Sequence, residues 1–199
     1  DWHYFGADHW LPGNNVHDIA VGDKVVYIGT DAGIGIITYE PYTLRKKAEF
    51  YERHINEWGH KRLGFIHTIY NDGREWIREI SDNDGGHTAP FLAAMSYKYV
   101  VTGDETARTQ AVEAFKAMLW LDKVTPKDGF IARAIWSATG DQDNRSSQGS
   151  GGLPAKWYPT KDGKWYWKGD TSSDEVIAHF YSVSLFHDLV AEGKEKEMA

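Results

Sequence analysis

The 199-residue chain contains no cysteine, which excludes disulfide bonds and thiolate chemistry but does not identify a cellular compartment. It has no apolar run approaching the roughly 18 residues of a membrane span, and no basic segment leading into an apolar one. Basic residues are also in deficit, because 22 Lys and Arg are outnumbered by 29 Asp and Glu. Broad nucleic-acid binding needs a basic surface, so this composition argues against it.

Tryptophan, in contrast, is abundant, with nine residues in the chain. Three of them, Trp157, Trp165 and Trp167, fall within eleven residues, and acidic residues follow directly. Carbohydrate sites use this mixture, because aromatic faces stack on sugar rings while carboxylates accept hydrogen bonds from hydroxyls. The alternative is that these aromatic residues form a small core beneath a long loop. In a strand, Trp165 and Trp167 would point to one side and Tyr166 to the other.

Residue patterns predict strands first and helices afterwards. Residues 25–28 and 34–38 have strand-like composition, and a helix begins after the predicted N-cap Thr43 and ends near Gly59. Two alternating runs within 62–80 flank Asn71-Asp72-Gly73 and predict a hairpin. We expect a helical hairpin next, with helices over 87–101 and from 104 to about 121.

The last third of the chain combines loop, hairpin and helix patterns. Residues 137–153 read as a long loop, and residues 157–167 as a hairpin with Asp162-Gly163 at its tip. The final helix is expected from Ser172 or Ser173 to about residue 192, with Ser172 and Glu175 matching a capping box. The remaining tail is expected to fray.

Several segments resemble a known family. The run YIGTDAGIGII is similar to a strand pair of a regulator-type β-propeller blade. The segments GFIARAI and DGKWYWKGDTSSDEVIAHFYSVSLFHDLV, together with residues 81–121, resemble the helical toroid of secreted bacterial carbohydrate-active proteins. The nearest group is the polysaccharide lyases that remove rhamnose linked to glucuronate. The similarity spans about residues 25–192, and WKGDTSSDE at 167–175 is its most specific part.

This resemblance and the patterns together define the expected fold class. It is mainly α with β-hairpins, part of an (α/α) toroid preceded by a short β segment like a propeller blade. The expected domains are a β segment over 1–41 and a helical toroid-like segment over 42–199. A complete toroid needs many more helices than the four long ones predicted here, and the chain begins at Asp1 rather than Met. We therefore expect either a part of a larger polypeptide or a compact, reduced version of the toroid fold.

Three acids follow the aromatic hairpin at the start of the last helix: Asp170, Asp174 and Glu175. Acids at a helix N-terminus stabilise the helix dipole, and Glu175 fits that structural role. Asp170 and Asp174 are catalytic candidates, because a glycoside hydrolase needs two carboxylates about 5–10 Å apart across the scissile bond.

Arginine and histidine supply further candidates. Arg133 lies inside a short apolar run and needs an anionic partner, either an internal carboxylate or a substrate uronate. His179 shares a helix face with apolar residues, which is more typical of a core histidine than of a catalytic one. His67 in the first hairpin and His87 at a helix start are similar cases.

The lyase resemblance implies β-elimination beside a uronate. Its carboxylate must be neutralised, a base must remove the C5 proton, and an acid must protonate the departing oxygen. By analogy, Arg133 is the neutralising residue and His179 or His87 the base. Tyr166 or Tyr181 is then the acid. Substrate contacts are assigned to these residues: Trp157, Trp165, Trp167, His67 and Glu175.

The expected function is a carbohydrate-active enzyme, a polysaccharide lyase on an acidic plant or microbial glycan, secreted or periplasmic in a bacterium. Two alternatives remain: a glycoside hydrolase with paired carboxylates, and a non-catalytic glycan-binding segment. Asp82-Asn83-Asp84-Gly85 and Asp141-Gln142-Asp143-Asn144 leave calcium possible, although polar turns explain both stretches better. No residue set has zinc-site spacing, so no metal ligand is assigned.

Overall fold

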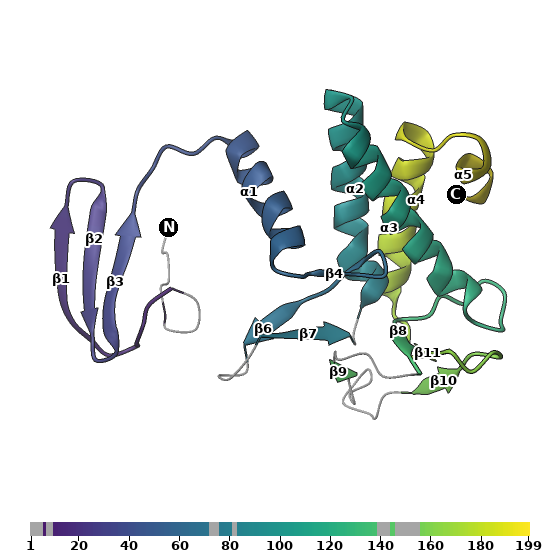
Figure 1. Ribbon diagram of the computed structural model, residues 1–199, viewed down its shortest axis with the longest axis horizontal. Coiled ribbons are helices and arrows are strands. Elements are labelled where there is room, and N and C mark those ends of the chain that lie inside the picture. Colours follow the sequence, from purple (N-terminus) through teal and green to yellow (C-terminus); the bar gives the residue numbers. More distant parts are fainter. Residues whose placement is uncertain (1–5, 7–9, 72–75, 81–82, 139–143, 146–155) are drawn as a thin grey trace. The chain divides into compact units, whose positions relative to one another are not determined.

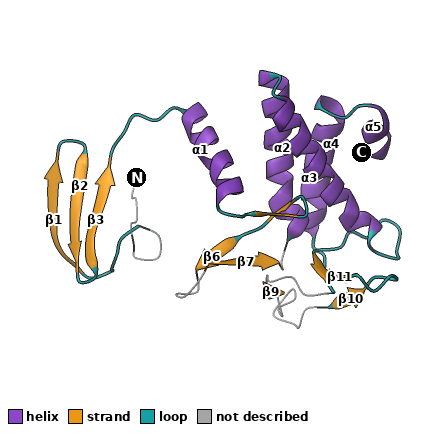
Figure 2. Ribbon diagram, in the orientation of Figure 1, coloured by secondary structure: helices purple, strands orange, loops and turns teal. Residues whose placement is uncertain are grey.

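A computed structural model describes the chain except for residues 1–5, 7–9, 72–75, 81–82, 139–143 and 146–155 (Figure 1). The chain forms two compact units, residues 1–51 and 52–199, and the boundary falls within a helix. Figure 2 shows strands in both units and most of the helices in the second.

The first unit contains a three-stranded antiparallel sheet in the order β1-β2-β3, formed by Val16–Gly22, Val25–Thr30 and Gly33–Thr38. The strands expected from the composition of 25–28 and 34–38 are confirmed. The two faces of the sheet are both apolar: Ile19 pairs with Ile28 on one face and Tyr27 with Ile36 on the other. Among the described residues of this unit, only Leu11 and Ile28 are buried hydrophobics.

Helix α1, Leu44–Glu57, follows this sheet. The predicted N-cap is confirmed, because the Lys46 N–H donates to the Thr43 hydroxyl over 3.2 Å. None of the described residues of α1 is buried, and Leu44 remains 87% exposed. Ion pairs one helical turn apart, such as Arg45–Glu49, lie along its surface.

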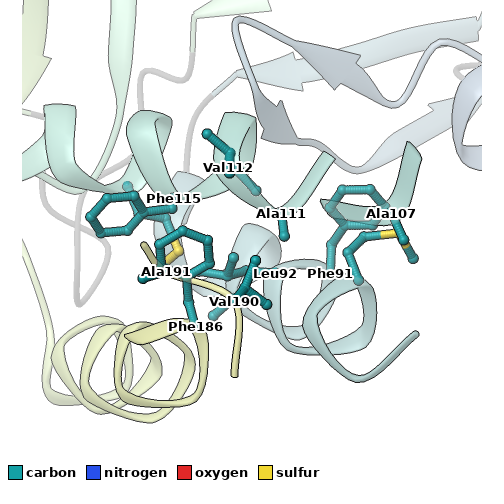
Figure 3. Close-up of a cluster of buried hydrophobic side chains, with 13 residues drawn as sticks. Phe91, Leu92, Ala107, Ala111, Val112, Phe115, Phe186, Val190 and Ala191 are labelled. Carbon is teal, nitrogen blue, oxygen red and sulfur yellow. The ribbon is translucent and has the colours of Figure 1, made fainter. Parts of the chain in front are cut away.

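Three helices of the second unit share one core: α2, Asp84–Thr102; α3, Glu105–Lys123; and α4, Ser173–Leu189. Thirteen buried residues form the cluster shown in Figure 3. Phe115 of α3 stacks on Phe186 of α4 with ring centroids 4.5 Å apart, and Leu92 of α2 is fully buried beside them. The predicted helical hairpin is confirmed in α2 and α3, which are joined at Gly103-Asp104.

Two helix ends differ from the sequence-based expectation. Helix α2 begins at Asp84 rather than at residue 87, so Pro90 lies beyond the first turn instead of within it. The tail that was expected to fray forms a short helix, α5, Gly193–Met198. Arg108 of α3 explains the ordered tail, because its guanidinium lies 3.0 Å from the Glu195 carboxylate.

Short strands connect and flank these helices. The 62–80 region forms two hairpins rather than one: β4 and β5, Lys61–Arg62 and Phe65–Ile66, and β6 and β7, Ile69–Asn71 and Trp76–Ile80. The tip of the predicted turn lies outside the described residues. The short strand β9, Asn144–Arg145, pairs with β7 in parallel.

A second three-stranded sheet has the order β10-β11-β8, formed by Trp157–Pro159, Trp165–Lys168 and Ile135–Ser137. The predicted hairpin over 157–167 is confirmed, and Gly163 at its tip adopts a φ of +67°.

The expected fold class is wrong. The described chain is 45% helical and 23% strand, with five helices and several small antiparallel sheets, and it is not a large (α/α) toroid. The physical reason is that α2, α3 and α4 bury their apolar faces against one another in a single cluster.

Candidate functional site

The N-terminal ends of α2 and α4 meet at a pair of glycines, Gly85 and Gly86. A Cβ atom at Gly85 would lie 2.2 Å from both Glu175 Oε1 and His179 Cε1. Glu175 therefore enters space that only glycine leaves open, and its Oε2 accepts a hydrogen bond from the Gly86 N–H at 3.1 Å. The predicted capping box is not formed: Ser172 is the N-cap of α4 as expected, but Glu175 bonds to α2 instead.

A second buried carboxylate, Asp84, lies close to this junction. It is 1% exposed, its Oδ2 accepts the Ile135 N–H at 3.0 Å, and its Oδ1 lies 3.5 Å from His67 Nδ1. Two buried cations, Arg62 and Lys168, are near enough to favour its charged form. The result is a buried cluster of charged and titratable side chains, defined by these residues: Arg62, His67, Asp84, Lys168, Glu175 and His179.

Burial controls the ionisation of the two acids in this cluster. It raises the pKa of Asp84 to about 7, although the Ile135 hydrogen bond and the charges of Arg62 and Lys168 oppose the shift. It also raises the pKa of Glu175 to about 8, where the neighbouring Asp84 carboxyl adds to the effect. Glu175 Oε1 has no hydrogen-bond partner among the described residues, which fits an acid that is neutral at pH 7.

Further polar groups lie next to this cluster, at the start of α4, where Asp174 is exposed and Arg133 is buried. Arg133 Nη1 donates to the Ser172 hydroxyl at 2.7 Å and to the Asp170 carbonyl at 3.4 Å. Asn83, the N-cap of α2, donates to Asp174 Oδ2 at 3.2 Å and so connects the two helix ends. Hydrogen bonds from Ser172 and Asn83 hold the pKa of the exposed Asp174 carboxyl below its usual range. We call this set the α2–α4 junction site: Asn83, Arg133, Asp170, Ser172 and Asp174.

The junction site combines features that favour an anion. Helix N-termini carry partial positive charge, and two of them adjoin here, although the Gly86 N–H of α2 is already bonded to Glu175. Arg133 is 8% exposed, so its charge acts in a partly water-excluded environment. Asp174 supplies an ionised acceptor suited to hydroxyl groups on the same ligand.

His179 is placed behind this site rather than in it. Its Nδ1 is 2.9 Å from the Glu175 carbonyl, so that nitrogen carries the proton when the ring is neutral. Burial lowers the pKa of the ring, which favours the neutral form. The ring lines a separate cavity of about 230 Å³ together with Phe115, Phe180 and other residues.

The aromatic hairpin forms another surface, which we call the aromatic groove. Trp165 and Trp167 point to the same side of β11, as predicted, and line a groove of about 610 Å³ with Tyr158. Tyr158 stacks on Trp167 at 4.7 Å, and Trp120 of α3 meets Trp165 edge to face at 4.8 Å. Two lysines complete the charged part of the lining, namely Lys123 and Lys161, with Asp162 beside them.

The other residues predicted to form the site lie on different elements of the second unit. Tyr166 points away from the groove and packs near Trp136 at 6.2 Å between ring centroids, half-buried. His87 is exposed in the first turns of α2, whereas Tyr181 is exposed farther along α4. Trp157 is half-buried on β10 opposite Lys168. The structure thus brings Arg133, Asp170 and Asp174 together, but separates them from the groove and from the cavity of His179.

Sequence reasoning missed several members of these sites. Asp84 was considered only for calcium, and Arg62, Lys168 and Trp120 were not singled out. Arg133 was chosen because it is a charged residue next to apolar ones. Lys168, which follows Trp165-Tyr166-Trp167, shows the same pattern. The segment DNDGG offered a signal for Asp84, because paired glycines at a helix start allow another element to approach closely.

Metal ligands do not gather in the part of the chain that the structure describes, where no three His, Asp or Glu side chains could hold an ion. Asp82 and residues 141–143 of the possible calcium segments lie outside that part. None of the described helices is both long and apolar enough to cross a membrane. No family model, curated protein or solved structure matches the chain.

Proposed function

We propose that the chain binds an acidic glycan at the α2–α4 junction site and cleaves it by β-elimination beside a uronic acid. The observation that carries this proposal is the placement of Arg133 where two helix N-termini adjoin, with its guanidinium held 2.7 Å from the Ser172 hydroxyl. A uronate carboxylate fits such a site, because guanidinium and helix N–H groups both bind planar anions.

The proposed reaction assigns one residue to each chemical step. Arg133 neutralises the uronate carboxylate, which makes the C5 proton more acidic. His87 is the better of the two proposed bases, because it is exposed whereas His179 is buried behind Glu175. The base takes the C5 proton, the electron pair forms the C4–C5 double bond, and the bond from C4 to the leaving oxygen breaks. Tyr166 protonates that oxygen, giving an unsaturated uronate and a free rhamnose.

A glycoside hydrolase receives less support from the same geometry. The two carboxylates with raised pKa values, Asp84 and Glu175, are 1% and 0% exposed and face the protein interior. A glycosidic oxygen could not reach either acid without displacing the packing around Gly85.

The experiment is an ultraviolet assay for the unsaturated uronate, with arabinogalactan that carries rhamnosyl-glucuronate ends as substrate. We expect activity in the unaltered chain and a loss of roughly 100-fold or more in Arg133→Gln and in His87→Ala. His187→Ala, which alters a histidine at the other end of α4, serves as the matched control. A folded chain without absorbance on a panel of acidic glycans would contradict the proposal, and sugar release without absorbance would identify a hydrolase.

A second candidate is glycan binding without catalysis, and the aromatic groove is the observation that favours it. Trp120, Tyr158, Trp165 and Trp167 present aromatic surface for sugar rings, while Lys123 and Lys161 suit acidic substituents. Calorimetric binding of the same glycan should then tolerate Arg133→Gln and fail in Trp165→Ala. Either function suits a secreted or periplasmic bacterial protein, which is the setting that we propose.

A further inference from the structure

A cavity of about 410 Å³ lies away from both surfaces, between the end of α1 and the β6–β7 hairpin. The described residues that line it are Trp58, His60, Ile69 and Trp76. Trp58 is 60% and Trp76 is 73% exposed, so neither indole is committed to the core. Large apolar side chains that are exposed and gathered around one cavity indicate a binding site.

The rings around this cavity are held in place before any ligand arrives. His54 stacks on Trp58 with centroids 4.1 Å apart and planes 17° from parallel, which covers one face of the indole. His60 Nδ1 lies 2.8 Å from the His67 carbonyl, so the neutral ring donates there and keeps Nε2 as an acceptor. Such preorganisation lowers the entropy lost when a ligand is bound.

We propose that this cavity binds a neutral pyranose ring and forms a glycan site separate from the α2–α4 junction site. Indole faces stack on the C–H faces of a sugar, Ile69 adds apolar contact, and His60 Nε2 accepts a hydroxyl hydrogen bond. None of the described residues that line the cavity is an Asp, Glu, Lys or Arg that could pair with a uronate charge. The volume also lies within the range of small-ligand sites, about 300–1,000 Å³.

This chemistry separates the cavity from the aromatic groove, where lysines accompany the tryptophans. A neutral backbone sugar and an acidic end sugar would thus be held at different places on the same unit. Sugar binding at this cavity involves neither Arg133 nor lyase activity, and it can be measured without a reaction.

The test is isothermal titration calorimetry of the whole chain with three neutral probes: galactotriose, xylotriose and cellotriose. We expect at least one probe to bind, with the dissociation constant raised about tenfold or more in Trp58→Ala and in Trp76→Ala. Trp76→Tyr should retain most of the affinity, which distinguishes lost stacking from lost folding. His60→Phe, which keeps a ring but removes the acceptor, should weaken binding several-fold.

Two control variants show whether the probe binds at this cavity. Trp10→Ala removes another exposed tryptophan, 66% exposed in the first unit, and should leave the affinity unchanged. Arg133→Gln should also leave it unchanged while it abolishes lyase activity, so the two proposals fail separately. The proposal is overturned if no probe binds, or if Trp58→Ala and Trp76→Ala bind as the unaltered chain does. It is equally overturned if Trp76→Ala instead dissolves a dimer, because the indoles would then contact a second copy.

Discussion

Gly85 shows how a single absent side chain organises the candidate site. Its missing Cβ leaves the space occupied by the Glu175 carboxyl and the His179 ring, both of which would lie 2.2 Å from that atom. Both of these groups are buried, so at least one of them must move to relieve the overlap.

Gly85→Ala is therefore expected to lower the free energy of unfolding by about 3 kcal/mol. Chemical denaturation followed by circular dichroism measures this change. Gly29→Ala is the matched control, because a Cβ there would meet its nearest neighbours at 3.7 Å, which is an ordinary contact. Equal stability of the two variants would show that α2 and α4 are less closely packed than described.

The two buried acids determine the expected pH dependence of stability. Burial raises the pKa of Asp84 to about 7 and that of Glu175 to about 8, both above the values near 4 of an unfolded chain. The folded chain thus holds protons that the unfolded chain has released. The free energy of unfolding must then fall as the pH rises from about 4, near the pKa of these acids in the unfolded chain, to about 8, the pKa of Glu175 in the folded chain.

Glu175→Gln should reduce this pH dependence, because it removes the later of the two titrations. Each acid contributes a slope of up to about 1.4 kcal/mol per pH unit below its folded pKa. Urea denaturation at several pH values gives the slopes. Glu197→Gln, which alters an exposed carboxylate on α5, should leave the slope as it is. A variant Glu175→Gln with an unchanged slope would mean that Glu175 is ionised in the folded chain.

Helix α4 has two chemically similar aromatic residues in opposite environments. Phe186 is fully buried and stacks on Phe115, whereas Phe180 is 70% exposed (Figure 3 shows the buried pair). The helix therefore stabilises the unit through one face, while its other face supplies little packing energy.

Phe186→Ala is expected to cost about 3–5 kcal/mol, because it opens a cavity in the three-helix cluster. Phe180→Ala should change the free energy of unfolding by less than about 1 kcal/mol. Thermal and urea denaturation of both variants provide the comparison. A similar loss in the two variants would contradict the assignment of the buried face.

Over the whole molecule, buried apolar surface is distributed unevenly. Among the described residues, the first unit buries only Leu11 and Ile28, whereas the second holds the thirteen-residue cluster. Local stability follows such burial, so the units should open with different free energies.

Hydrogen exchange monitored by mass spectrometry should reveal this difference. Amides of β1, β2 and β3 are expected to exchange at least about tenfold faster than those of α2 and α3. Phe186→Ala should accelerate exchange in α2 and α3 and leave the sheet unchanged. Uniform protection across both units would show that they unfold as one.

Local sequence patterns determined much of the secondary structure. Asp162-Gly163 predicted a hairpin turn, and Thr43 predicted the start of a helix. The alternation of Trp165 and Tyr166 predicted which side chains lie on each face of β11. These three features depend on neighbouring residues alone. The tail was expected to fray, but it forms a helix whose Glu195 pairs with Arg108, a residue far away in the sequence.

Tertiary structure alone decided how the candidate site is assembled. Glu175 had the spacing of a capping-box residue, yet it bonds to Gly86 because α2 and α4 meet there. The sequence shows that Asp84 is acidic, but it does not show that this residue is buried near Lys168. It also does not show that Trp120 lines the aromatic groove. Periodicity and turn chemistry act over a few residues, whereas burial and the pKa of a group depend on segments that only folding brings together.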